Sequence, residues 1–432
     1  MSNKSHTMKE ASKHTRTPKV RFPEYRDAEG WEETELQKIA LPVSERAING
    51  DGDKVLSLSG EHGIVLQSDY FGKKVAGDNA ERYIKIARND FVYNDRTTKQ
   101  SIYGTIKRLS KYEGGIVSPI YKCFRFNSDE NPVFWDWYFE SGIHESELGG
   151  LVNEGARAGR FNISIDKFLS TSVWHPRLPE QQAIADCLTS LDELIAANGQ
   201  KLDALTAHKK GLTQQLFPRK GKTFPSLRFP EFQNAGEWVE KRLEKIGRVI
   251  RGSSPRPKGD SRYYGGPVPR LMVQDVTRDG KWVTPQIDSL TKEGAKLSRP
   301  CSAGTLTIVC SGNVGVVSFL AVDACIHDGF LALIDIDESI VTKDFLFHSL
   351  STLREQFEKG ATHGGVFTNL TTSSIDQFGV MCPLPPEQNK IADCLTSLDE
   401  AIFAQTQKLE ALKTHKKGLM QQLFPSPEEV EA

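Results

Sequence analysis

Apolar and polar positions follow one another in steps of four and three residues along two long segments of the chain. This spacing runs from Ile184 to Leu216 and again from Ile391 to Leu423. It is the a/d stripe of a heptad repeat, which predicts long helices that pack against another helix. The seam residues that we predict are Ile184, Leu188, Leu191, Ile195, Leu202, Leu205, Ile391, Leu395, Leu398, Ile402, Leu409 and Leu412.

Polar residues interrupt both stripes at matching places. Asn198 and Lys209 interrupt the first stripe, and Gln405 and Lys416 interrupt the second. Polar seam residues lower the stability of a coiled coil but fix its register. We therefore expect the two helices to pair as an antiparallel coiled coil, with a pseudo-two-fold axis between the halves of the chain. The alternative is that each helix packs only on its own domain.

The ends of both segments carry helix-boundary residues. Each segment opens with Pro-Glu, at Pro179 and Pro386, where a first-turn proline is tolerated and a carboxylate is favourable at the positive end of the helix dipole. Each segment closes at a proline, Pro218 or Pro425, which cannot continue the helix. About 36 residues at about 1.5 Å per residue would give a rod about 54 Å long.

The two segments are copies of one sequence. Residues 179–218 and 386–425 are identical at 30 of 40 positions, with an offset of 207 residues. The Arg-Phe-Pro-Glu strings at Arg21 and Arg228 have the same offset. An internal repeat on this scale indicates two copies of one structural unit. We expect a disordered basic tail (1–17), a first domain (18–176), a helix and linker (177–224), a second domain (225–382), a second helix (383–425) and an acidic tail (426–432).

The segments between the repeated parts are equal in length but differ in sequence. Short apolar runs broken by Gly, Asp, Asn and Pro predict strands, and each segment has one late helical run, so the predicted fold class is α+β, two mixed α/β domains joined by the long helices. The expected strands are 54–59, 83–87, 115–117, 121–126, 305–309, 314–320 and 330–335, and the expected helices are 135–140 and 343–358.

Charge is distributed unevenly along the chain. The 432 residues carry a formal net charge of -1, which by itself gives no hint of a nucleic-acid partner. Residues 82–125, however, hold ten Lys or Arg against three Asp or Glu, and residues 248–300 hold eleven against five. Cations interspersed with Tyr, Asn and Gln are typical of surfaces that bind DNA phosphates and base edges, although one such strip alone is also typical of a solvated surface.

Both basic strips and the loops beside them supply candidate DNA-contacting residues. Arg pairs bidentately with guanine, and Gln or Asn pairs with adenine. The candidates are Lys73, Lys74, Tyr93, Asn94, Lys107, Arg108 and Lys111 in the first domain, and Arg251, Ser253, Arg256, Lys258, Tyr264, Arg270, Gln274 and Asn313 in the second.

Motifs for catalysis or for a cofactor are not found in the sequence. Gly221 and Lys222 resemble the end of a phosphate loop, but Leu216 stands where that loop needs a glycine. The string at Asn131 resembles the Asn-Pro-Pro-Phe motif of adenine methyltransferases, with Val133 in place of the second proline. Seven cysteines without a C-x-x-C pair suit a reducing cytoplasm. We expect a non-catalytic cytoplasmic protein without cofactor, metal or membrane segment.

The repeated helix motif resembles a known family. The string P-E-Q-x-x-I-A-x-x-L-x-x-L-D, followed by G-L-x-Q-Q-L-F-P, is similar to the conserved regions of type I restriction-modification specificity (S) subunits. Residues 101–104, 115–121, 252–256 and 264–266 resemble the target-recognition domains of that family. The resemblance covers nearly the whole chain after the first 18 residues.

The resemblance implies a function for each part. Two target-recognition domains would read the two halves of a bipartite DNA site, which we expect to be asymmetric because the domains differ. The helices would set the spacing and bind two methyltransferase (M) subunits, and nuclease/translocase (R) subunits would complete the complex. S-adenosylmethionine, ATP and Mg would be used by those partners. The alternatives are a coiled-coil assembly protein without sequence-specific DNA binding and, less in keeping with the missing motifs, a self-contained enzyme.

Overall fold

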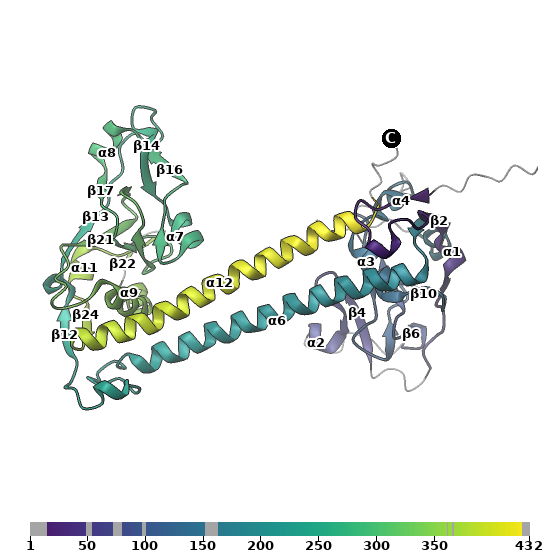
Figure 1. Cartoon of the computed structure of the whole chain (residues 1–432), viewed down its shortest axis with the longest axis horizontal. Helices are drawn as coiled ribbons and strands as arrows, with labels where there is room; N and C mark the ends of the chain where they lie inside the picture. The colour runs from purple at the N-terminus through teal and green to yellow at the C-terminus, as the bar shows by residue number, and fades with distance from the viewer. Residues whose placement is uncertain are drawn as a thin grey trace, which may run out of the picture. The chain divides into compact units, whose positions relative to one another are not determined.

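Two compact units make up the chain in the computed structural model. The structure describes residues 15–48, 54–71, 80–96, 101–151, 163–360, 362–364 and 367–425. Unit 1 comprises residues 1–199 and 408–432, and unit 2 comprises residues 200–407. The two long helices, α6 (Leu178–Leu216) and α12 (Pro385–Leu423), have 39 residues each and contribute to both units (Figure 1). The predicted long helices are thus confirmed.

Unit 1 contains three small sheets in its described part. One is antiparallel with the order β3-β10-β7-β8, and a second has the order β5-β4-β9-β6, in which β4 and β9 are parallel. The third joins β2 to β1 and β11. The strands are β1 (Thr15–Arg16), β2 (Trp31–Glu35), β3 (Ala40–Pro42), β4 (Val55–Ser59), β5 (Gly63–Leu66), β6 (Ile84–Ala87), β7 (Phe91–Asn94), β8 (Thr105–Arg108), β9 (Gly114–Val117), β10 (Lys122–Phe126) and β11 (Ser172–His175).

The core of unit 1 is aromatic and joins the domain to both long helices. The rings of Phe126 and Trp135 stack with centroids 4.6 Å apart. Leu188 of α6 and Leu423 of α12 are buried in the same cluster. Aromatic side chains bury large areas, so this cluster fixes the domain on the helices. The shorter helices of the unit are α1 (Leu36–Ile39), α2 (Gln67–Phe71), α3 (Pro132–Glu140), α4 (Glu145–Gly149) and α5 (Ile165–Leu169).

Unit 2 is built on a five-stranded and a four-stranded sheet. The five-stranded sheet has the order β13-β21-β18-β19-β15, and the four-stranded sheet has the order β16-β14-β20-β17. Two further strand pairs are β12-β24 and β22-β23. The strands are β12 (Val239–Arg242), β13 (Arg248–Arg251), β14 (Tyr264–Leu271), β15 (Trp282–Val283), β16 (Asp288–Leu290), β17 (Arg299–Cys301), β18 (Leu306–Val309), β19 (Val317–Leu320), β20 (Ala324–Ile326), β21 (Phe330–Ile334), β22 (Thr362–Gly364), β23 (Phe367–Asn369) and β24 (Gly379–Cys382).

The main core of unit 2 also includes both long helices. Leu216 of α6 and Leu395 of α12 are buried with residues of β18 and β21. This core is mostly aliphatic, whereas that of unit 1 is rich in aromatic rings, so the two domains differ inside as they do in sequence. The shorter helices are α7 (Val273–Asp279), α8 (Lys292–Leu297), α9 (Lys343–Thr352), α10 (Arg354–Gly360) and α11 (Thr372–Asp376).

Most secondary structure expected from the sequence is present. Each predicted strand overlaps an observed one, and the predicted late helices correspond to α3 and to α9 followed by α10. One boundary was wrong: the basic tail was expected to extend to residue 17, but Thr15 and Arg16 form β1, because they pair with Glu32 and Trp31 of β2. The remainder of that tail and the acidic tail lie outside the described residues.

The predicted seam residues divide into two groups. Ile184, Leu188, Ile391 and Leu395 are at most 1% exposed and belong to the domain cores. Leu409 is also buried, and the remaining seven seam residues are half-buried. The polar interruptions Asn198 and Gln405 are each 6% exposed. The N-terminal turns of each helix therefore pack on a domain. The alternative prediction, that each helix packs on its own domain, is supported for these turns.

Candidate nucleic-acid interface

A basic cleft of about 510 Å³ lies between strands of unit 2. Its residues come from the ends of β13 and β14, from β16 and from the loops that follow β13, β18 and β20. Strand ends and loops can present side chains at the surface without disturbing the sheet. The lining residues are Arg251, Ser254, Arg256, Lys258, Arg270, Met272, Asp288, Ser311, His327, Asp328 and Gly329.

Arg270 is the most deeply placed cation of the basic cleft. Its residue is 4% exposed. One terminal nitrogen, Nη1, forms an ion pair with the carboxylate of Asp288, and Nη2 donates to Ser254 Oγ at 2.7 Å. Its Nε is buried and has no acceptor among the described residues. The guanidinium is therefore fixed by two partners and keeps one donor for an acceptor on a ligand.

His327 supplies a second donor to the basic cleft. Its Nδ1 accepts the backbone N–H of Gly329 at 2.9 Å, which places the ring proton on Nε2. Burial, followed by the positive charge of Arg270, lowers the pKa of His327, so the ring is neutral at pH 7. Nε2 is buried without an acceptor among the described residues. Two donors without acceptors favour an acceptor-rich ligand, such as a phosphate or the O6/N7 edge of guanine.

Asp328 holds the cations at the wall of the basic cleft. Its backbone oxygen accepts from Arg251 Nε at 3.2 Å and Nη2 at 3.1 Å. Its carboxylate accepts from Ser254 Oγ at 2.5 Å, and that hydrogen bond is the main reason why the pKa of Asp328 is lowered. Arg256 lies 3.9 Å from the same carboxylate, with 74% of its side chain exposed. Arg256 and the exposed Lys258 are therefore the cations most accessible to a polyanion.

The cleft brings together four of the eight candidates predicted in the second domain, namely Arg251, Arg256, Lys258 and Arg270. Two others are beside it. Tyr264 donates to Pro255 O at 2.9 Å, with its ring 5.5 Å from the Arg270 guanidinium, and Ser253 Oγ donates to Leu297 O at 3.2 Å. Gln274 is exposed on α7, and Asn313 accepts from Arg354; neither lines the cleft.

The candidates in the first domain are mostly engaged within the protein. Lys107 Nζ lies 2.5 Å from Glu140, and Arg108 Nε lies 3.1 Å from Asp136. Both acids are on α3, so these cations hold the helix against β8. Lys111 is exposed beside the ring of Tyr112, and Asn94 is half-buried in β7. Lys73 and Lys74 lie outside the described residues.

Tyr93 is not a surface residue, and its selection as a DNA contact was wrong. Its side chain is 0% exposed, its ring is stacked on Phe168 with centroids 4.7 Å apart, and its hydroxyl donates to Tyr103 O. An interior phenol cannot reach a duplex. The strip around it is basic, but the strand alternation places this ring inside.

Sequence reasoning missed several residues of the basic cleft. Ser254, Asp288, His327 and Asp328 orient its cations or supply donors, but the selection relied on positive charge and amide side chains. A usable signal was present at His327-Asp328, where two titratable residues follow a short buried strand, β20. Such a turn places polar side chains at a sheet edge.

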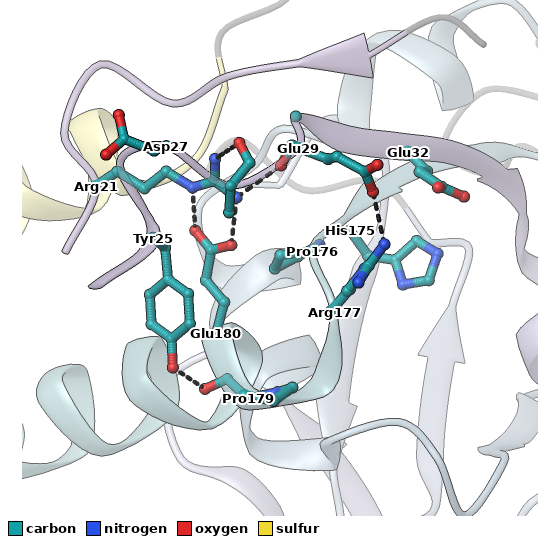
Figure 2. A pocket seen from close by; sticks show the side chains of 12 residues that line it. Arg21, Tyr25, Asp27, Glu29, Glu32, His175, Pro176, Arg177, Pro179 and Glu180 are labelled. Atoms are coloured by element: carbon teal, nitrogen blue, oxygen red, sulfur yellow. Dashed lines mark hydrogen bonds and ion pairs between the residues drawn. The ribbon is translucent and has the colours of Figure 1, made fainter. Parts of the chain in front are cut away.

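A second pocket, of about 570 Å³, lies where residues 18–40, which we call the first arm, meet the start of α6. Figure 2 shows Arg21 at its centre, directed at Glu180. Arg21 Nε and Nη2 lie 2.7 and 2.6 Å from the two carboxylate oxygens, and the guanidinium also donates to the backbone oxygens of Ala28 and Glu29. The side chains are 6% and 4% exposed. We call this pair the first arm clasp.

Unit 2 contains the same clasp 207 residues later. Arg228 Nε and Nη2 each lie 2.7 Å from an oxygen of Glu387, and the guanidinium donates to the backbone oxygens of Ala235 and Gly236. Bidentate Arg–carboxylate pairs of this kind are geometrically specific. The clasps explain the repeated Arg-Phe-Pro-Glu and Pro-Glu-Gln strings, because one supplies the arginine and the other the carboxylate.

The glutamine after each clasp carboxylate holds the domain. Gln181 accepts the backbone N–H of Asn131, and Gln388 accepts that of Thr342, at 2.9 and 2.8 Å. Asn131 and Thr342 are the N-cap residues of α3 and α9. The string at Asn131 that resembles a methyltransferase motif is therefore a helix cap. Each domain is anchored on its long helix by the same residue type at the same place in the repeat.

No group of three or more His, Cys, Asp or Glu in the described part of the chain is arranged to hold a metal ion. None of the helices described there combines the length and the apolar character that a membrane span requires.

Comparison with known proteins identifies relatives. The type I restriction modification DNA specificity domain family matches residues 235–414. The putative type I restriction enzyme MjaX specificity subunit of Methanocaldococcus jannaschii is 29% identical over 254 residues, 58% of this chain and 57% of that protein. The HindI specificity subunit of Haemophilus influenzae is 27% identical over 150 residues, 34% of this chain and 32% of that protein. The chain thus matches about half or less of the length of these curated relatives.

Solved structures share the fold. The type I restriction-modification S subunit from M. genitalium superposes with a TM-score of 0.59 at 14% identity, covering 95% of this chain and 99% of that one. A chain from a type I R-M system solved for its complex assembly and conformational transition gives 0.53 at 18% identity, with coverage of 92% and 98%. Residues 235–414 thus match the type I restriction modification DNA specificity domain family, and the chain is similar in sequence to type I restriction enzyme specificity subunits.

Proposed function

We propose that this chain is the DNA specificity subunit of a type I restriction-modification complex. Each domain binds one half of a bipartite DNA site, and the long helices set the distance between the halves. The observation that carries the proposal is that two equivalent ion pairs, Arg21–Glu180 and Arg228–Glu387, hold two different domains. The domains differ in their sheets and in their cores. Two different domains on equivalent clasps favour a DNA site whose two halves differ in sequence.

The basic cleft supports DNA as the ligand of the second domain. Exposed Arg256 and Lys258 suit phosphate contacts, which position a protein on the duplex. The donors Arg270 Nε and His327 Nε2 suit base-edge or phosphate acceptors deeper in the cleft. We assign the half-site contact of unit 2 to this cleft.

An antiparallel coiled coil is supported by two equivalent ion pairs. In unit 2, Lys209 of α6 pairs with Asp399 of α12; in unit 1, Lys416 of α12 pairs with Asp192 of α6. The residue that lies later in α6, Lys209, thus pairs with the residue that lies earlier in α12, Asp399, as is expected of antiparallel helices. A 39-residue helix is about 58 Å long, equivalent to roughly 17 base pairs at about 3.4 Å each. Two half-sites about one helical turn apart would fit on that length.

A helix face that is repeated in α6 and α12 favours the binding of two copies of one partner protein. Ser190, Ala197, Ala204 and Gly211 recur at intervals of seven along α6, and their mates Ser397, Ala404, Ala411 and Gly418 are identical in α12. The serines and alanines are exposed, and a side chain at either glycine would meet nothing within 4 Å. Because glycine inside a helix costs about 1 kcal/mol relative to alanine, its retention in both copies favours close approach of another chain. We assign this face to two methyltransferase subunits.

The remaining activities are assigned to partners. In this proposal the methyltransferase subunits use S-adenosylmethionine, and nuclease/translocase subunits use ATP and Mg. Specific duplex binding tests the proposal. The chain copurified with its methyltransferase subunits should bind a cognate duplex far more tightly than a scrambled one, with affinity falling steeply as salt rises. Equal affinity for both duplexes would instead favour the coiled-coil assembly protein.

A further inference from the structure

A polar junction joins the second domain to both long helices in unit 2. Lys209 of α6 forms an ion pair with Asp399 of α12, and each side chain is 27% exposed. His348, on α9 of the domain, has Nε2 3.0 Å from Thr396 Oγ1 and Nδ1 4.0 Å from Asp399 Oδ2. Lys281 donates to the same threonine at 3.0 Å. One short stretch of α12 thus contacts the domain helix and the other long helix together.

Unit 1 has the equivalent junction. Lys416 of α12 pairs with Asp192 of α6, and its Nζ lies 4.3 Å from the ring centroid of Trp137. Trp137 Nε1 donates to Thr189 Oγ1 at 3.4 Å. Thr189 and Asp192 are the repeat mates of the threonine and aspartate in unit 2. Trp137 is the sixth residue of α3, as His348 is of α9, so each domain helix meets its long helix at the same position.

The lysine in each junction comes from the other repeat. Lys209 belongs to the first repeat but serves the junction of the second domain, and Lys416 belongs to the second repeat but serves the junction of the first. The threonine, the aspartate and the domain helix come from the repeat that is being held. Each junction is therefore complete only when the two long helices are in register.

Stability alone does not explain these lysines. Both occupy seam positions of the heptad stripe, where an apolar side chain would stabilise the pairing and a polar one fixes its register. An ion pair that stays partly exposed to solvent contributes little to stability, commonly below about 1 kcal/mol. The identical lysine in both copies indicates a geometric role instead.

We propose that Lys209 and Lys416 are positioning residues, each of which fixes the orientation of the other repeat's recognition domain on the helix pair and thereby sets the permitted spacing between the DNA half-sites. This inference rests on the proposed function. Without the lysine, the domain remains anchored by its arm clasp, by Gln388 or Gln181 and by core contacts with both long helices, but the ion pair that holds the two helices in register at the junction is lost. The orientation of the domain on the helix pair is then less narrowly fixed, and neighbouring spacings become accessible.

Spacer tolerance in the assembled complex tests the proposal. The chain is co-expressed with its methyltransferase subunits, and methylation is sequenced on a library of sites with the native spacer or with one base pair more or less. The variants are Lys209→Asp, Asp399→Lys and the double charge exchange, and Lys210→Asp is the control because this exposed neighbour is not part of the junction. Lys416→Asp with Asp192→Lys repeats the test in unit 1.

The expected pattern is specific. Lys209→Asp should raise methylation at the shifted spacers about fivefold relative to the native spacer, the factor equivalent to an ion pair of about 1 kcal/mol. The double exchange should restore the original discrimination, and Lys210→Asp should leave it unchanged. Should Lys209→Asp fail to fold by circular dichroism, Lys209→Met, which keeps length and helix propensity, should show the same relaxed spacing.

Two negative outcomes are distinguishable. If the unaltered chain methylates one bipartite site and the folded lysine variants keep its spacer discrimination, the positioning role is wrong while the proposed function stands. If the unaltered complex methylates no bipartite site, the proposed function itself is wrong, and with it the inference.

Discussion

Arg228 of the second arm (residues 225–247) lies against Glu387 at the start of α12, with Nη2 2.7 Å from Oε2 and both side chains less than a tenth exposed. The hydrogen bonding that Arg228 donates to the Glu387 carboxylate is the main reason why the pKa of Arg228 is raised, so the guanidinium is firmly charged. The pair joins residues 159 positions apart in the chain. It closes the arm onto the helix that follows the whole second domain.

Breaking one carboxylate of a clasp should destabilise the unit that contains it. Glu387→Gln leaves the Arg228 guanidinium buried without its counter-charge, and we expect a loss of about 3 kcal/mol in the free energy of unfolding, measured by denaturant titration. Glu180→Gln should have a similar effect in unit 1. Glu231→Gln is the matched control, because its pair with Lys390 is half exposed, and it should cause no measurable change. Equal effects of all three variants would contradict the structural role of the clasps.

The exposed cations of the basic cleft should act through phosphate. Arg256→Ala and Lys258→Ala should each weaken binding to cognate and scrambled duplexes alike and lower the salt slope of the binding constant by about one. Lys292→Ala, an exposed lysine of the same basic strip on α8 outside the cleft, is the control and should leave the slope unchanged. A change of slope only in the control would place the DNA elsewhere on the domain.

Buried His348 should make unit 2 sensitive to acid. Burial, followed by the charges of Lys281 and Lys209, lowers the pKa of His348 to about 3, from 6.5 when solvated. Above about pH 6.5 the ring is neutral in both the folded and the unfolded state, but below that value only the unfolded state binds the proton, so the free energy of unfolding falls by about 1.4 kcal/mol per pH unit. His348→Gln should reduce the loss of unfolding free energy between pH 6.5 and 5.5. An unchanged loss would show that the ring is not held neutral.

Helix length should control the half-site spacing. Inserting one heptad at the same place in both α6 and α12 keeps the seam in phase and adds about 10.5 Å of helix, or roughly 3 base pairs. Methylation mapped in the complex should then require a correspondingly longer spacer. An insertion in one helix only would offset the ion pairs at Lys209 and Lys416, and we expect it to abolish methylation. An unchanged spacer in the double insertion would refute the spacing role of the helices.

The long helices and the seven expected strands were predictable because their signals are local. A heptad stripe of five repeats between two prolines predicts a long helix. The apolar run 121–126 predicts a strand, and it corresponds to β10. The arm strands were not predictable. Every residue of β12 (Val239–Arg242) is exposed, so no burial pattern marks it, and it forms only because it pairs with β24 nearly 140 residues later.

The candidate site was predictable only in its cations. Arg251, Arg256, Lys258 and Arg270 were selected from local charge density, and the fold brings them to one cleft. Asp288 and His327 come from other strands, and their contribution depends on tertiary neighbours that sequence spacing does not reveal. Tyr93 was wrongly selected because its neighbours along the chain are basic. Basic neighbours do not determine on which face of a strand a ring lies.

The most direct test of the account is to map methylated adenines in DNA from cells that express this chain with its methyltransferase subunits. Two different domains on equivalent supports predict one bipartite, asymmetric site with a fixed nonspecific spacer, and exchanging the second domain should change only one half of it. A strictly palindromic or continuous site would contradict the claim that the two domains read two different half-sites.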